Sequence, residues 1–150
     1  MDFMQIAINE AKKGLKNKDG GPFGAVIVKD NKVISKANNT VLKTNDPSAH
    51  AEINVIRKAS KKLKNFDLSG CQLYTTCEPC PMCYFAIHWA KIKTVYYGAN
   101  RSDAAKIGFS DKALYDIFNG KKSKLKLIKE NSKKCVELMT EFIRLKGKLY

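Results

Sequence analysis

The sequence predicts a single α/β domain, because strand-like and helix-like segments alternate along its 150 residues. Three observations carry this prediction: a hairpin pattern over 25–34, a helix–strand–helix–strand succession over 46–97, and amphipathic helical spacing near both ends. A chain of this length can bury one core without dividing into two. Because no repeat, linker or low-complexity tract interrupts the pattern, we expect one domain over residues 1–150.

The first elements are expected to be a helix and a hairpin. Apolar residues recur at helical spacing over 3–16, and Asp2 is available to cap this helix. Two apolar runs, 25–28 and 33–34, then flank a polar Asp-Asn pair at 30–31. Such a pair between apolar runs is typical of a tight turn, so the runs predict two hairpin strands.

A second helix is expected to begin at Asp46-Pro47, because Asp is a favoured N-cap and Pro is favoured in the first turn. Apolar residues at helical spacing continue this helix as far as Leu63. His50 and Glu52 would then lie in its opening turns.

The next segments predict a parallel βαβ unit. A strand is expected over 71–76, and a helix beginning at Pro79 or Pro81 continues to residue 90. A second strand is expected over 92–97. Because a crossover helix connects the two strands, they are expected to be parallel.

The C-terminal third is less regular. Its pattern predicts partly helical structure over 104–118 and a short strand over 125–128. Apolar residues share one helical face over 133–146, so the chain is expected to close with an amphipathic helix.

The net charge of +14 is the bulk feature that favours an anionic partner. The basic residues are nearly all lysines spread along the chain, and only Arg57, Arg101 and Arg144 carry the planar group suited to bidentate phosphate or base contacts. We therefore favour a solvated lysine-rich surface over a dedicated nucleic-acid face.

The cysteines and the apolar runs indicate a cytoplasmic protein with no membrane span. No apolar run approaches the roughly 20 residues that cross a bilayer, and an early acid at Asp2 stands where a signal peptide would be basic. The five cysteines are an odd number, with three of them between Cys77 and Cys83, which favours thiols or metal ligands over a disulfide framework.

The most informative residues are His50 and Glu52, followed by Cys80 and Cys83. One nitrogen and two thiolates suit tetrahedral zinc, and three protein ligands leave the fourth position for water, as in catalytic sites. Both ligand segments are expected at helix starts, where the helix dipole favours thiolates. Glu52 is free to move protons between this water and the leaving amine. The paired spacing is the known signature of zinc nucleobase deaminases.

Other interpretations of the same residues remain open. A lone His at a helix start is often a polar surface group, and a Cys-x-x-Cys pair can be a redox pair or half of a structural site. Cys77 forms an overlapping Cys-x-x-Cys with Cys80, and it is the nearby candidate for a fourth ligand in a zinc-stabilised binding module. Cys71 and Cys135 are expected to be core residues.

Four stretches of the sequence resemble the cytidine deaminase-like superfamily, and within it the bacterial guanine deaminases. The first three stretches, residues 20–28, 44–52 and 77–83, are shared across several deaminase branches. The fourth, 103–111, is the one that resembles the guanine branch. The resemblance implies a three-layer α/β/α sandwich around a five-stranded mixed sheet.

The resemblance also implies a site. One zinc ion per subunit would be held by His50, Cys80 and Cys83, with Glu52 as proton shuttle. Asp111 would hold the exocyclic amine of a purine and aid its departure. The implied substrate-binding positions are Asn39, at the purine edge, and Phe23, Ala51, Trp89 and Tyr150.

The family resemblance implies a homodimer whose subunits exchange their C-terminal segments, so that Tyr150 reaches the partner's pocket. The expected reaction is hydrolysis of guanine to xanthine and ammonia. A tRNA adenosine deaminase is the main alternative, because it shares the first three stretches and would explain the positive charge. Cytosine or guanosine deamination is a nearer variant, since a larger pocket would admit a sugar.

Overall fold

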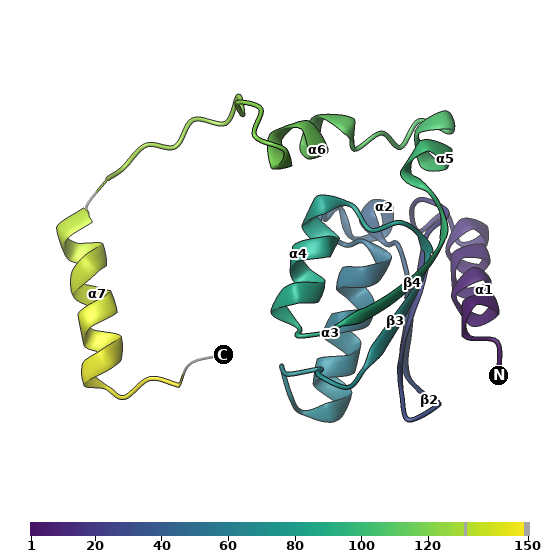
Figure 1. Ribbon diagram of the computed structural model, residues 1–150, viewed down its shortest axis with the longest axis horizontal. Coiled ribbons are helices and arrows are strands. Elements are labelled where there is room, and N and C mark those ends of the chain that lie inside the picture. Colours follow the sequence, from purple (N-terminus) through teal and green to yellow (C-terminus); the bar gives the residue numbers. More distant parts are fainter. Residues whose placement is uncertain (131, 149–150) are drawn as a thin grey trace.

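The computed structural model describes residues 1–130 and 132–148, and these residues place helices on both faces of one mixed sheet (Figure 1). The sheet has four strands in the order β2-β1-β3-β4, so the prediction of five strands is wrong for the described residues. The strands are β1 (Gly24–Lys29), β2 (Lys32–Asn38), β3 (Gln72–Cys77) and β4 (Thr94–Ala99). Helix α1 (Phe3–Lys16) covers one face, and α3 (Ala51–Leu63) and α4 (Pro81–Trp89) cover the other.

The strand pairing follows the sequence pattern. β1 and β2 form the predicted antiparallel hairpin, and its turn residues Asp30 and Asn31 have φ angles of 48° and 57°. Asp and Asn tolerate this left-handed conformation better than most residues, which suits a two-residue hairpin turn. β3 and β4 pair in parallel, as predicted for a βαβ unit, whereas β1 and β3 pair antiparallel.

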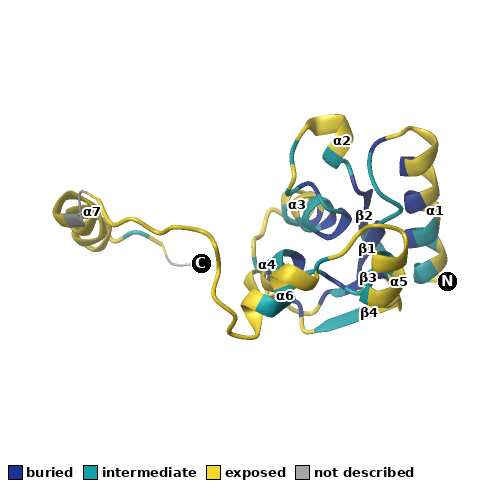
Figure 2. Ribbon diagram, turned by 90° about the horizontal axis from the view of Figure 1, so that it is seen from above, coloured by how far each residue is buried: buried dark blue, intermediate teal, exposed yellow. Residues whose placement is uncertain are grey.

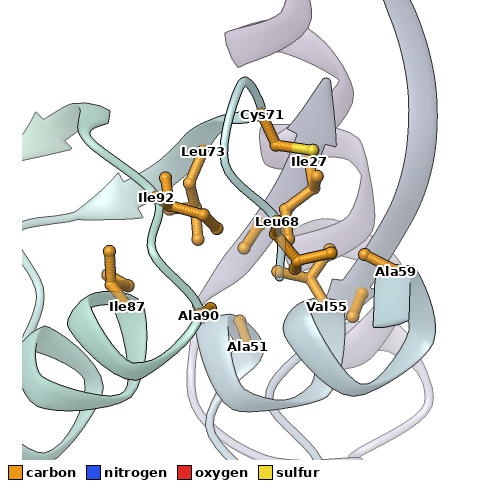
Figure 3. Packing of buried hydrophobic residues seen from close by; sticks show 12 residues of the cluster. Ile27, Ala51, Val55, Ala59, Leu68, Cys71, Leu73, Ile87, Ala90 and Ile92 are labelled. Atoms are coloured by element: carbon orange, nitrogen blue, oxygen red, sulfur yellow. The ribbon is translucent and has the colours of Figure 1, made fainter. Parts of the chain in front are cut away.

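β1 is buried on both faces because helices cover both faces of the sheet. Val26 and Val28 pack with Ala7 of α1, while Ile27 packs with the cluster under α3 and α4 (Figure 3). This alternation explains why β1 is a continuous apolar run. At Gly24, a Cβ atom would lie 2.1 Å from the carbonyl oxygen of Ala7, so only glycine allows α1 to pack this close.

The second predicted helix begins later than expected. α3 starts at Ala51 with His50 as its N-cap, and Asp46-Pro47 instead belongs to a turn. Asp46 Oδ1 accepts hydrogen bonds from the Ser48 backbone N–H, at 2.8 Å, and from its hydroxyl, at 2.7 Å. The Asp side chain therefore stabilises this turn rather than capping the helix.

The start of α4 and the loop between β2 and α3 lie where the sequence predicts the functional residues. α4 begins at Pro81 with Cys80 as its N-cap, which decides between the two prolines. A short unpredicted helix, α2 (Val41–Thr44), lies in the loop between β2 and α3. The Asn54 side chain ties this loop to α3, since it donates to Asn38 O at 3.0 Å and to Ala49 O at 3.2 Å.

The C-terminal segment leaves the three layers. α5 (Arg101–Lys106) and α6 (Lys112–Phe118) confirm the expected partly helical region, and α7 (Ser132–Arg144) confirms the final amphipathic helix. The predicted strand over 125–128 is wrong, because these residues have no regular secondary structure and pair with no strand within the described chain. α7 lies apart from the sheet in both views and is exposed on all sides (Figures 1 and 2). No helix in the described ranges has the length and apolarity needed to span a bilayer.

Candidate active site

Three side chains from two helix starts form a metal-ligand cluster. His50 is the N-cap of α3, Cys80 is the N-cap of α4, and Cys83 lies in the first turn of α4. His50 Nδ1 is 3.6 Å from Cys80 Sγ and 3.5 Å from Cys83 Sγ. Zn–N and Zn–S bonds of about 2.05 and 2.3 Å at a tetrahedral angle separate N and S by about 3.6 Å. The cluster therefore fits one zinc ion, as the sequence predicted.

The two thiols differ in their affinity for a proton. The hydrogen bond from Cys83, followed by the interaction with His50, lowers the pKa of Cys80 to about 4. The same bond to Cys80, together with burial, raises the pKa of Cys83. The hydrogen bond with Cys80 also raises the pKa of His50. Cys80 is thus ready to bind a metal as a thiolate, whereas Cys83 must release a proton when the metal enters.

Glu52 lies beside this cluster and is 5% exposed. Thr75 Oγ1 donates a hydrogen bond to Glu52 Oε1 at 2.8 Å, and Cys83 Sγ donates to Oε2 at 3.5 Å. Burial is the largest influence on this carboxyl group, and it raises the pKa of Glu52 above its ordinary value. A buried carboxyl group with a raised pKa is a better proton acceptor than an exposed one, which suits a group that accepts and returns a proton.

A cavity of about 520 Å³ opens in front of the cluster. It is lined by six of the residues that the sequence singled out: Phe23, Asn39, His50, Glu52, Cys80 and Asp111. Cys83 is buried behind this lining. The cavity has room for a small flat ring, which would pack against its apolar side chains.

Asn39 is held by its surroundings with one face toward the cavity. Its Oδ1 accepts the Val41 backbone N–H at 3.1 Å, and its NH2 group donates to no other group in the described part of the chain. A Cβ atom on Gly20 would lie 2.1 Å from the same Oδ1, so the turn at Gly20 is shaped to the Asn39 side chain. Behind it, Asn38 Nδ2 donates to the buried carboxylate of Asp19 at 3.1 Å.

Asp111 stands at another wall of the cavity, directly before α6. Its Oδ1 accepts a hydrogen bond from Arg101 Nε at 3.2 Å. Arg101 and Glu78, which also line the cavity, were not predicted as site residues. The only signal for Arg101 was its rarity, because it is one of three arginines in a lysine-rich chain.

The aromatic wall of the cavity contains a third unpredicted residue, Phe109. Phe109 meets Phe23 edge to face, with ring centroids 5.1 Å apart and planes at 86°. Both rings line the cavity. The position of Phe109 was visible in the guanine-branch stretch, but nothing in the spacing of the sequence placed it opposite Phe23.

Two of the remaining predicted site residues, Ala51 and Trp89, lie outside the cavity lining. Ala51 is fully buried in the core cluster, and the side chain of Trp89 is 72% exposed at the end of α4. Tyr150 lies outside the described residues. The substrate contacts of these three residues stay predictions.

Cys77 does not join the metal-ligand cluster. It donates its thiol to Asn100 O at 3.8 Å, and burial raises the pKa of Cys77 to about 11. Across the described ranges, the group arranged to hold a metal consists of His50, Cys80 and Cys83. A fourth protein ligand from Cys77, which a closed structural site would need, is thus not part of the cluster.

Comparison with known proteins identifies relatives of this arrangement. Residues 1–99 match the cytidine and deoxycytidylate deaminase zinc-binding region. The chain is 51% identical over 113 residues to guanine deaminase from Bacillus subtilis strain 168, over 75% of this chain and 72% of that protein. The X-ray structure of B. subtilis guanine deaminase superposes with a TM-score of 0.91 at 39% identity, covering 99% of this chain and 96% of that one.

A second class of relatives is more distant. The tRNA-specific adenosine deaminase of Aquifex aeolicus strain VF5 is 43% identical over 97 residues, which cover 65% of this chain and 64% of that protein. The tRNA-specific adenosine deaminase of Buchnera aphidicola subsp. Schizaphis graminum strain Sg is 34% identical over 145 residues, which cover 96% of this chain and 93% of that protein.

Proposed function

We propose that this chain, which belongs to the family with the cytidine and deoxycytidylate deaminase zinc-binding region, hydrolyses guanine to xanthine and ammonia. The observation that carries the proposal is one cavity that brings Asn39 and Asp111 to the metal-ligand cluster and Glu52. The similarity to B. subtilis guanine deaminase supports the choice of substrate.

The metal-ligand cluster and Glu52 account for the hydrolysis. His50, Cys80 and Cys83 would hold zinc, which when bound activates a water molecule for attack on the ring carbon that bears the amine. Glu52 accepts one proton from this water and passes it to the ring nitrogen, and it then carries the second proton of the water to the leaving amine, which departs as ammonia. Thr75, by donating to Oε1 at 2.8 Å, fixes the Glu52 carboxyl group in this position.

Asn39, Asp111 and the aromatic wall account for substrate recognition. The free NH2 group of Asn39 pairs with acceptor atoms on the purine edge, because its Oδ1 is already bound to Val41. The Asp111 carboxylate accepts N–H groups of the exocyclic amine. Phe23 and Phe109 pack against the flat ring.

Ammonia release from a substrate panel tests the proposal. The zinc-loaded protein is expected to release ammonia from guanine faster than from guanosine, cytosine, adenine or a tRNA anticodon stem-loop. Faster release from the stem-loop would instead make the chain a tRNA adenosine deaminase. Glu52→Gln should retain one zinc per chain and lose at least about a thousandfold in kcat, because the shuttle is gone while the ligands remain. Full activity in this variant would refute the role of Glu52.

The proposed assembly is a homodimer that exchanges C-terminal segments. One face of α7 carries apolar side chains that are largely exposed in the single chain, including Val136, Met139 and Ile143. A second copy of the chain would bury this face, which favours association by about 25 cal/mol per Å² of apolar surface. Sedimentation should give a dimer, and Ile143→Asp should shift it toward monomer, with Lys134→Asp as a matched exposed control on the same helix. A monomeric wild-type protein would refute the exchange.

The cysteines support a cytoplasmic location, which we also propose. All five are free thiols in the structure, as expected in a reducing compartment. Fractionation of the native host with detection of the chain in the cytosolic fraction tests this location.

A further inference from the structure

We infer that Arg101 is a positioning residue, which holds the Asp111 carboxylate at a fixed place relative to residues 78–80, the loop that contains the metal ligand Cys80. The inference rests on the proposed function, in which Asp111 binds the exocyclic amine. Arg101 begins α5, and Asp111 directly precedes α6, so the two residues lie on a part of the chain that passes over the cavity.

Arg101 joins Asp111 to the loop that contains Cys80. Its Nε donates to Asp111 Oδ1 at 3.2 Å, and its guanidinium carbon lies 3.2 Å from the centroid of the Tyr115 ring. The Tyr115 hydroxyl group donates to Pro79 O at 2.9 Å, and Pro79 immediately precedes Cys80. These three contacts form a continuous path from the Asp111 carboxylate to a metal ligand.

The backbone of Arg101 is held by the same loop. Its N–H group donates to Glu78 Oε2 at 3.2 Å, and Glu78 lies two residues before Cys80. The main chain of Arg101 is thus bound directly to Glu78, and its side chain stacks on Tyr115, which is bound to Pro79. The backbone bond fixes where the Arg101 side chain begins, and the stack on Tyr115 restricts its guanidinium group, so the carboxylate that it binds is restricted as well.

The geometry leaves one carboxylate oxygen of Asp111 for substrate. Arg101 donates to Oδ1 through Nε, and within the described ranges no other side chain donates a hydrogen bond to the Asp111 carboxylate. The side chains of Arg101 and Asp111 are 33% and 21% exposed, so the pair is partly desolvated and is more than a surface ion pair. Oδ2 can then accept an N–H group of the amine while Oδ1 stays bound.

The chemistry of this contact explains why arginine stands here in a chain rich in lysine. A planar guanidinium group can stack on the Tyr115 ring and donate to Asp111 at its edge at the same time. A lysine ammonium group has no plane to stack, so it cannot hold the carboxylate in one orientation in this way. The chain has 28 basic residues, of which Arg101 is one of only three arginines.

A kinetic double-mutant cycle tests the inference. Arg101→Gln is expected to lower kcat for guanine by about tenfold or more with a smaller change in KM, because the amine must be held most tightly as it leaves. Arg101→Lys should recover little of this loss. In the background of Asp111→Asn, the further change Arg101→Gln should alter kcat less than about twofold, because Arg101 then has no carboxylate to position.

The matched control is Lys106→Gln on the same helix. Lys106 forms an exposed ion pair with Asp103 at 3.1 Å, outside the cavity lining, so its loss should change kcat less than about twofold. If the losses from Arg101→Gln and Asp111→Asn multiply in the double variant, Arg101 acts independently of Asp111 and the inference is overturned. Full activity of Arg101→Gln overturns it as well.

A second cycle separates this inference from the proposed function. Urea unfolding of the zinc-loaded wild type, both single variants and the double variant measures the coupling between Arg101 and Asp111 without any substrate. Coupling together with no turnover of guanine would refute the proposed function and support the contact. Additive losses of stability would show that the contact does not form, which overturns the positioning role even if guanine is deaminated.

Discussion

Replacing Thr75 by Val removes the hydroxyl group that holds Glu52 while preserving the shape of a β-branched strand residue. Thr75 is fully buried, Glu52 is 5% exposed, and the bond between them is 2.8 Å long. A buried hydrogen bond to a charged group contributes about 1.5–3 kcal/mol, and no water replaces the lost donor at such a site. We therefore expect the free energy of unfolding to fall by about 2 kcal/mol, which lowers Tm by about 4–8 °C in a domain of this size.

The same substitution has a second, independent consequence for the pH dependence. The Thr75 hydrogen bond lowers the pKa of Glu52 against the dominant effect of burial, which raises it. Removing the bond raises the pKa further, so the carboxylate forms only at higher pH. The acidic limb of kcat/KM for guanine should therefore move to higher pH in Thr75→Val.

Thermal melting and pH–rate profiles on the zinc-loaded protein measure both effects. Thr44→Val is the matched control, because the exposed Thr44 hydroxyl donates only to Thr40 O in the preceding turn, at 2.8 Å. Its effect should stay within about 0.5 kcal/mol. If Thr75→Val has the same Tm and the same acidic limb of kcat/KM as Thr44→Val, the reasoning about Glu52 is refuted.

Three further substitutions test the metal site, the substrate wall and the packing. Cys83→Ser should reduce bound zinc, measured by elemental analysis, to below about a tenth of the wild-type content, because the serine hydroxyl group does not supply a thiolate; stoichiometric zinc would refute the ligand assignment. Gly20→Ala should raise KM for guanine about tenfold and change kcat less. The reason is that the new Cβ atom would lie 2.1 Å from Asn39 Oδ1 and would displace the Asn39 side chain. An unchanged KM would exclude Asn39 from substrate binding. Gly24→Ala should lower the free energy of unfolding by about 3 kcal/mol in urea titrations, because the new Cβ atom would lie 2.1 Å from the Ala7 carbonyl oxygen. An unfolding midpoint equal to that of the wild type would contradict the close packing of α1.

Local patterns predicted the helices and strands of residues 1–99 almost completely. The hairpin, the βαβ unit and the first helix depend on apolar spacing and turn residues that are close together in sequence, so no knowledge of distant contacts was needed. The metal-ligand cluster was predictable for the same reason. His50 and the pair of cysteines each lie at a helix start, and the βαβ topology brings helix starts on one side of a sheet together.

The errors arose where a local pattern has two physical outcomes. Asp46-Pro47 has the pattern of a helix start, yet the Asp46 side chain satisfies the donors of Ser48 in a turn, and the helix begins at Ala51 instead. An alternating apolar run such as 125–128 forms a strand only when another strand accepts its hydrogen bonds. Within the described chain this run has no strand partner, so it does not join the sheet.

By itself the sequence determined the class of fold, the zinc-binding residues and the neighbouring acid Glu52. These depend on residue type and on spacing between residues that are close together in the sequence. Only the tertiary structure decided that Cys77 lies apart from the metal-ligand cluster, that Phe109 faces Phe23, and that Arg101 binds Asp111. The physical reason is that these contacts depend on how loops after different strands meet above the sheet, and such meetings follow from packing and chain direction rather than from any local pattern.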